Sequence, residues 1–255
     1  MNSRQLALAL LGRELRERYL STLGGLAWVL ITPVLLLAIY AFVFVELLGA
    51  RFGNRVGGDV IAFLAIGMWP WHAFADSLSR GTTALSGNAA LIGQIAIPRG
   101  WLVLVPTLGA ALIHTASFAL VVVMLTLMGK TVLGMGWWTA LAAYLMIVLN
   151  ASALGMVLAP LNVFFRDVGT LLPQVLTFWM LLTPIFFDRS TLRPDLGQWL
   201  AFNPMTGLIE ALRAGLLHGE TNLSAFWGPA VFTGMLVLFA TLTARRFLAR
   251  IEDFL

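Results

Sequence analysis

The sequence predicts an all-α polytopic membrane protein with six transmembrane helices, on the grounds of its composition and its long apolar stretches. Hydrophobic residues make up 60% of the 255 residues and charged residues only 11%, which leaves too little polar surface to cover a soluble globule. A helix needs about 20 apolar residues to cross a hydrocarbon core about 30 Å thick. Six stretches reach that length: 25–48, 59–79, 102–128, 137–160, 168–187 and 226–247.

Residues 1–22 predict an amphipathic helix that lies in the membrane interface. A signal peptide fits this segment poorly, because small residues at a cleavage site are missing. A water-facing helix that packs on a partner protein is the alternative. The apolar residues recur at steps of three and four, and opposite charges are paired at i, i+4 on the other side: Leu8, Leu11, Leu15 and Tyr19, then Arg13 with Glu17 and Glu14 with Arg18.

The distribution of cations predicts that both termini are cytoplasmic. An even number of spans places the two termini on the same side, and Lys and Arg concentrate on the cytoplasmic side. The N-terminal segment, the loop 80–99, the turn at Arg166 and the C-terminal tail hold ten of the sixteen cations. Because these cations are scattered and form no basic patch, no nucleic-acid partner is expected.

The segment 188–225 on the opposite side predicts a re-entrant or surface helix before the last span. After Asn203 and Pro204, an apolar face and a Glu210/Arg213 pair at i, i+3 are typical of a helix that is too short to span. The apolar face consists of Leu208, Ile209, Leu212 and Leu216. We therefore expect a single transmembrane domain, 1–255, with an interface helix in 1–22, four spans in 25–160, an elbow and a fifth span in 161–187, the re-entrant segment in 188–225, and the last span and tail in 226–255.

Few residues carry the chemistry of an enzyme. The triplet Gly129, Lys130, Thr131 resembles the end of a phosphate-binding loop but lacks the earlier glycine, and cysteine is absent. His72, His114 and His218 lie on separate segments without the spacing of a metal site. Asp76 is expected to pair with Arg80 one turn later. An intramembrane lipid-processing enzyme that uses Asp76 and His72 is the alternative from another class.

Three aromatic residues in the spans are candidates for a sugar path. Tyr40 and Phe44 share a face of the first span, and Trp179 lies deep in the fifth span. Sugar rings stack on aromatic faces, but packing in the core or contact with lipid also accounts for each of these residues.

Arg166 and Asp167 interrupt an apolar run, which indicates a tight cytoplasmic elbow between the fourth and fifth spans. An arginine at a helix centre costs about 2.5 to 3.5 kcal/mol on insertion scales, so a helix that spans through it is disfavoured. Pro160 and Asn162 close one span, and Asp167 is expected to cap the next with its carboxylate. A role in coupling is compatible with this capping.

Three stretches of the chain resemble the permease subunit of type-2 ATP-binding-cassette exporters, which move lipid-linked O-antigen, capsular polysaccharide and teichoic acid across bacterial plasma membranes. These stretches are RELRERYLSTLGGLAWVLITPVLLLAIYAFVF, then FFRD followed by LTPIFF, then FNPMTGLIEALRAGLL. The resemblance implies a homodimer of six-span subunits in the bacterial inner membrane. It also implies a channel lined by the first and fifth spans, and separate soluble ATPase subunits that bind ATP and Mg²⁺, with no cofactor in this chain.

In such exporters a short coupling helix between the second and third spans contacts the ATPase. Here the matching stretch is SGNAALIGQIAIPRG, with Asn88, Leu91, Ile92 and Pro98 at the positions of the pattern. It departs from the usual pattern in showing Gly93, Gln94 and Ile97 where a Lys and a Phe are common. Together with Phe165, Arg166 and Asp167, the four matching residues are the expected ATPase contacts.

The sequence thus predicts the channel subunit of an exporter for a polysaccharide linked to polyprenyl diphosphate, such as O-antigen, powered by a separate ATPase. The expected partners are that ATPase, a second copy of the permease, membrane lipid and the lipid-linked glycan. The closest alternative is the same machinery with another substrate, either a lipo-oligosaccharide or a hydrophobic drug.

Overall fold

The computed structural model describes residues 11–12, 27–43, 59–89, 98–221 and 226–247, and the regular secondary structure of this part is helical. Its helices are α2 (Ala27–Ala41), α3 (Val60–Gly87), α4 (Arg99–Leu127), α5 (Gly136–Phe164), α6 (Asp167–Leu181), the 3₁₀ turn η4 (Arg189–Thr191), α7 (Pro194–Ala201), α8 (Pro204–Leu217) and α9 (Trp227–Phe247). The predicted interface helix in 1–22 lies outside the described residues, apart from positions 11 and 12.

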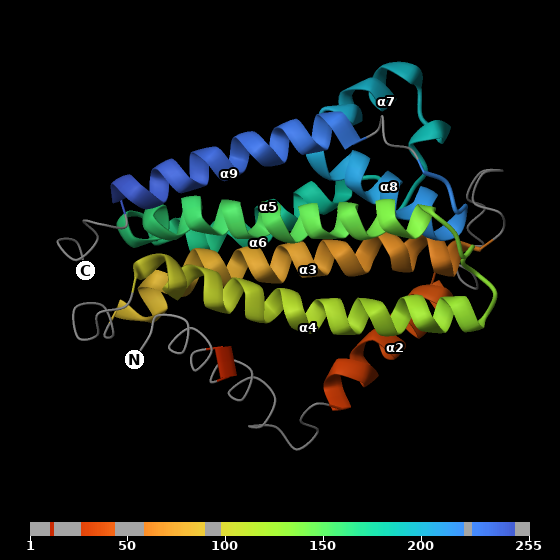
Figure 1. Ribbon diagram of the computed structural model, residues 1–255, viewed down its shortest axis with the longest axis horizontal. Helices are drawn as coiled ribbons and strands as arrows, with labels where there is room; N and C mark the ends of the chain where they lie inside the picture. Colours follow the sequence, from red (N-terminus) through yellow and green to blue (C-terminus); the bar gives the residue numbers. More distant parts are fainter. Residues whose placement is uncertain (1–10, 13–26, 44–58, 90–97, 222–225, 248–255) are drawn as a thin grey trace.

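The long helices run alongside one another and alternate in direction (Figure 1). At one end of the bundle α3 ends, α4 begins, α5 ends and α6 begins, while α7 and α8 lie at the opposite end. We call these the elbow end and the outer end. The alternation agrees with spans that cross a membrane back and forth.

Three of the described helices are long and apolar enough to cross a membrane: α4, α5 and α9. Their bounds agree with the predicted spans to within four residues. α3 is equally long but carries His72 and Asp76 near its middle, and the described parts of α2 and α6 are 15 residues each. The count of six spans therefore stays a prediction.

The second predicted span was too short, because α3 continues past Ser79 to Gly87. Its last two turns are polar, but their side chains bond along the helix itself. Arg80 pairs with Asp76, and the hydroxyls of Ser79, Thr83 and Ser86 donate to carbonyl oxygens three or four residues earlier. The continuous apolar stretch of the sequence ends near Ser79, whereas the helix continues for two more turns.

The fifth predicted span was too long, because α6 ends at Leu181 and not near Phe187. Pro184 has no N–H to donate, and its ring disfavours helical backbone at Thr183. The chain therefore turns before it reaches the outer segment.

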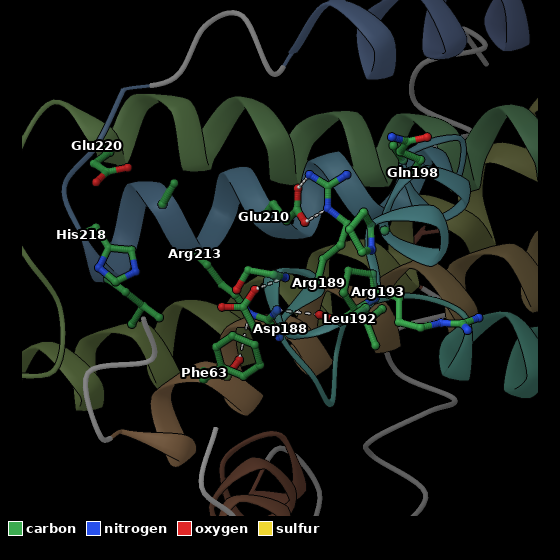
Figure 2. A pocket seen from close by; sticks show the side chains of 17 residues that line it. Phe63, Asp188, Arg189, Leu192, Arg193, Gln198, Glu210, Arg213, His218 and Glu220 are labelled. Atoms are coloured by element: carbon green, nitrogen blue, oxygen red, sulfur yellow. Dashed lines mark hydrogen bonds and ion pairs between the residues drawn. The ribbon is translucent and has the colours of Figure 1, made fainter. Parts of the chain in front are cut away.

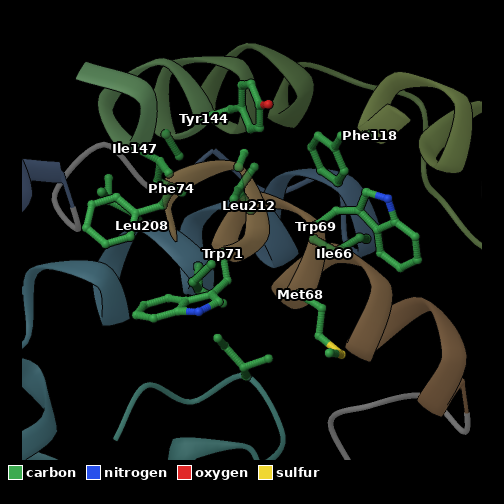
Figure 3. Close-up of a cluster of buried hydrophobic side chains, with 14 of the residues drawn as sticks. Ile66, Met68, Trp69, Trp71, Phe74, Phe118, Tyr144, Ile147, Leu208 and Leu212 are labelled. Carbon is green, nitrogen blue, oxygen red and sulfur yellow. The ribbon is translucent and has the colours of Figure 1, made fainter. Parts of the chain in front are cut away.

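The core centres on α3, whose large side chains pack against α4, α5 and α8 (Figure 3). Phe118 of α4 stacks on Tyr144 of α5 with ring centroids 5.3 Å apart. The predicted apolar face of α8 is confirmed, because Leu208, Ile209, Leu212 and Leu216 are all buried. α8 is therefore an inserted helix of the core and not a surface helix.

α8 fits against α5 because two glycines allow their backbones to touch. A Cβ atom on Gly136 would lie 2.7 Å from the Gly215 carbonyl oxygen and 2.6 Å from the carbonyl carbon of Gly219. Both obstructing atoms are backbone, so no side chain can turn aside. Gly215 faces the same constraint from the Gly136 backbone.

Replacing Gly136 with Ala should force α5 and α8 apart and lower the free energy of unfolding by about 1–3 kcal/mol, the usual range for overpacking. Thermal unfolding of the purified protein in detergent, followed by circular dichroism, measures the loss. Gly134→Ala is the matched control, because its nearest neighbour would be 3.9 Å away. Equal stability of the two variants would contradict the proposed backbone contact.

Candidate functional site

The elbow between α5 and α6 presents the predicted contact residues at the surface. α5 ends at Phe164 and α6 begins at Asp167, so only two residues connect the helices. The side chains of Phe165, Arg166 and Asp167 are all exposed, Phe165 to 66%. An exposed phenylalanine beside two opposite charges on a tight turn is a suitable contact for a partner protein.

Asn162 fixes the elbow from inside. Its side chain is 4% exposed; its Oδ1 accepts from the Gly169 N–H at 2.7 Å, and its Nδ2 donates to Ser86 Oγ at 3.1 Å. It thereby joins α5 to the first turn of α6 and to the end of α3. A Cβ atom on Gly169 would lie 2.8 Å from Asn162 Oδ1, so glycine leaves room for this bond.

The prediction that Asp167 caps α6 was wrong. Arg166 occupies the N-cap position without a side-chain hydrogen bond, and Asp167 is the first helical residue. Asn162 instead accepts a free N–H of the first turn, from the preceding helix. Asp167 still lies where a negative charge is favourable, because the first turn of a helix carries partial positive charge.

The second predicted contact segment is only partly described. Asn88 is the C-cap residue of α3, and its side chain donates to the Ala84 carbonyl at 2.8 Å. Pro98 is exposed and directly precedes α4. Leu91 and Ile92 lie outside the described residues. Ser86, the partner of Asn162, lies two residues before Asn88, so the two contact segments are joined through one side chain.

The predicted pairing of Asp76 with Arg80 is confirmed, with 3.1 Å between Asp76 Oδ1 and Arg80 Nε. The other carboxylate oxygen lies 3.1 Å from His114 Nε2 on α4, a contact that connects α3 to α4. His72 Nε2 is buried without a hydrogen-bond partner. In the described part of the chain no three His, Asp or Glu residues are arranged to hold a metal ion.

The three aromatic candidates for a sugar path are placed differently. Trp179 is half-buried, donates from Nε1 to Asn203 Oδ1 at 3.0 Å, and packs edge-on against Trp71 and Phe74. Tyr40 packs at the margin of the core. Phe44 lies outside the described residues. Trp179 therefore has a packing role, and the sugar path stays a prediction.

Arg213 of α8 is a buried charge at the outer end. It is 7% exposed, and it donates to the carbonyl oxygens of Phe63 (3.2 Å), Pro184 (2.5 Å) and Ile185 (2.7 Å). Its guanidinium carbon also lies 3.4 Å from the centroid of the Phe63 ring. Burial lowers the pKa of Arg213 to about 9, which leaves it charged at neutral pH.

The expected pair between Glu210 and Arg213 does not form. Glu210 instead binds Arg189 through two parallel contacts of 2.8 and 3.0 Å. Arg213 points into the core because it shares the buried face of α8 with Ile209 and Leu212. The sequence does not show which backbone carbonyl groups Arg213 binds. Only the position of Arg213 near the apolar face of α8 could have indicated that it is buried.

Comparison with known proteins identifies relatives over most of the chain. A family model described as ABC-2 type transporter matches residues 5–217. The O-antigen export system permease protein RfbA of Myxococcus xanthus is 26% identical over 83% of this chain and 80% of its own length. RfbA of Klebsiella pneumoniae is 25% identical over 91% and 87%, and the capsule polysaccharide export inner-membrane protein CtrC of Neisseria meningitidis serogroup B is 23% identical over 96% and 91%.

Replacing Asn162 with Ala should destabilise the elbow by about 1–3 kcal/mol, because the Gly169 N–H loses its acceptor. Asn162→Asp keeps an acceptor for that N–H and should recover part of the loss. Thermal unfolding of both variants in detergent measures the difference. If the Asn162→Ala variant is as stable as the wild-type protein, Asn162 does not stabilise the elbow.

Replacing Arg213 with Met should cost at least about 3 kcal/mol, since it removes a buried cation and leaves several carbonyl groups without their donor. Arg193→Met serves as the control, because the Arg193 side chain is 73% exposed and its loss should cost no more than about 0.5 kcal/mol. Equal unfolding temperatures for the two variants would disprove this role of Arg213.

Proposed function

Because the chain belongs to the ABC-2 type transporter family, we propose that it is the channel-forming subunit of a bacterial polysaccharide exporter. The exported substrate is a polysaccharide linked to polyprenyl diphosphate, such as O-antigen. This substrate crosses the inner membrane through a homodimer of six-span subunits. The observation that carries the proposal is the similarity to permeases named for O-antigen and capsule export over most of the chain.

The chain is a transport subunit without a catalytic domain, and family membership implies an ATPase partner. The geometry of its one nucleotide-like triplet supports the placement of ATP and Mg²⁺ on that partner. Gly129, Lys130 and Thr131 lie in and just after the turn that follows α4, where the Lys130 ammonium is 2.5 Å from the Asp59 carboxylate and Thr131 contacts Thr126. The described residues before this triplet form the helix α4, whereas a phosphate-binding loop of this kind follows a strand.

The elbow end is the proposed site of ATPase docking, and it faces the cytoplasm together with both termini. Closure of the ATPases would press on two contact regions, Asn88–Leu91–Ile92–Pro98 and Phe165–Arg166–Asp167. Asn162 joins the second region to the end of α3. A push at either region is therefore shared by α3, α5 and α6, which would move as rigid rods between two channel arrangements.

The exposed apolar faces of α2 and α6 support a channel between two copies of the chain. α6 buries only Leu172 and Leu176 within the described structure. On its other face Leu171, Val175 and Phe178 are more than half exposed. Such a stripe requires lipid or a second protein surface beside it, which suits the proposed dimer with Tyr40, Phe44 and Trp179 near the path of the glycan.

Deletion of the gene followed by analysis of cell-surface glycans tests the proposed cargo. The expected result is loss of one surface polysaccharide and accumulation of its lipid-linked form on the cytoplasmic side, both reversed by the wild-type gene. A normal glycan profile, together with altered drug resistance or lipo-oligosaccharide display, would reject the polysaccharide assignment and leave the transport role intact.

Reversing both elbow charges, with Arg166→Glu and Asp167→Arg, should leave membrane insertion intact and reduce export at least about tenfold, because unfavourable charge contacts cost a kcal/mol or more. Export is measured as surface glycan at matched expression, and coupling as stimulation of ATP hydrolysis by the permease. Asp195→Arg, an exposed charge on α7 at the outer end, should have no such effect. Wild-type export by the double variant would contradict the docking site.

A further inference from the structure

The outer end contains a pocket of mixed polar and apolar lining that the proposed transport mechanism does not use. Its volume is about 990 Å³, near the upper end of the range for small-molecule sites, about 300–1,000 Å³. η4, α7 and α8 form its walls, and Phe63 of α3 closes its base (Figure 2). It lies at the opposite end of the bundle from the elbow (Figure 1).

The walls of the pocket are held rigid by internal contacts. Arg189 of η4 and Glu210 of α8 form the two parallel bonds described above. Arg213 anchors the base through its three carbonyl partners. A pocket whose walls are fixed before a ligand arrives loses little entropy when one binds.

Three other polar side chains of the pocket are available to bind a ligand. Gln198, His218 and Glu220 line it and are exposed, and their side chains form no hydrogen bond or ion pair with the residues that the structure describes. Figure 2 shows His218 and Glu220 at one end of the pocket and Gln198 at the other. A ligand that extends along the pocket can therefore reach free donors and acceptors at both ends.

The balance of these groups favours an uncharged ligand with many hydroxyls. Three arginines and three carboxylates line the pocket, so their formal charges cancel: Arg189, Arg193, Arg213, Asp188, Glu210 and Glu220. An anion would meet the carboxylates and a cation the guanidinium groups, whereas a drug-like ligand requires mainly apolar walls. Each sugar hydroxyl both donates and accepts, which matches a lining of mixed donors and acceptors.

We propose that this pocket binds uncharged sugar residues of the exported glycan as the polymer leaves the outer end of the channel. The proposal rests on the proposed export function and adds to it a binding site at the outer end of the helix bundle. Binding must be weak, because a polymer in transit has to be released at every step. The mixed, partly exposed lining is suited to such short-lived contacts.

Protection of a single cysteine tests the site, because the chain has no cysteine of its own. Ser190→Cys is nearly isosteric and lines the pocket, while Asp195→Cys on α7 is exposed outside it. Both variants are labelled with a membrane-impermeant maleimide in spheroplasts that make the glycan and in spheroplasts with glycan synthesis blocked. Glycan should slow labelling at position 190 at least about threefold, since an occupied site is shielded, and leave position 195 unchanged.

Two further labelling experiments identify the ligand. Lipid-free glycan purified from the wild-type strain, added to the glycan-deficient spheroplasts, should restore protection at position 190. Adding Gln198→Ala and His218→Ala to the Ser190→Cys chain should weaken this protection about tenfold in glycan concentration, as expected for the loss of two hydrogen bonds.

Equal labelling at position 190 with and without glycan, in cells that still export it, would overturn the pocket and leave the export function standing. Failure of the lipid-free glycan to protect would assign the occupancy to the lipid carrier and also overturn the proposal. Absence of glycan export by the wild-type chain would instead reject the proposed function, and the pocket assignment with it.

Discussion

The buried Arg213 is the interaction on which the outer half of the structure depends. Pro184 and Ile185 are buried non-helical residues, and the carbonyl groups of such backbone must be satisfied by the protein itself. α6 stops before Thr183 and Pro184, and Arg213 donates to two of the carbonyl groups in the turn that follows. Its third bond reaches Phe63 of α3. One side chain therefore holds the turn that follows α6, joins α8 to α3 and anchors the base of the outer pocket.

At the elbow end, too, a buried polar side chain bonds to a backbone group at the end of a helix. Asn162 places an amide where α3, α5 and α6 meet, and it satisfies an N–H at the start of α6 that no side chain of that helix reaches. α3 and α5 run from this joint to the outer end, where α8 packs on both. Polar side chains thus fix the two ends, and apolar packing makes the helices between them rigid. Such an arrangement suits a protein that transmits a movement from one face of a membrane toward the other.

The apolar patterns of the sequence predicted the three helices that are long and apolar enough to cross a membrane, α4, α5 and α9, and the inner face of α8, including Leu208 and Leu212. They misplaced the ends of α3 and α6, because those depend on side chains that bond along their own helix and on the proline at 184. Pairing over short distances was predictable for Asp76 with Arg80 but not for Glu210, whose partner Arg189 precedes it by 21 residues. The contacts of Arg213 and Asn162 could not be predicted, since backbone acceptors and donors are present at nearly every residue and only the fold selects among them.

In the proposed mechanism this chain forms a passage for a glycan, and a separate ATPase supplies the energy. The most direct measurement uses proteoliposomes that contain the purified chain with or without its co-purified ATPase. A labelled polyprenyl-diphosphate glycan is supplied on the ATPase side, and its arrival on the other side is followed by susceptibility to an added glycosidase. Arrival only when ATPase and ATP are both present is the predicted result. Transport by the chain alone, or with the ATPase but without ATP, would contradict the account.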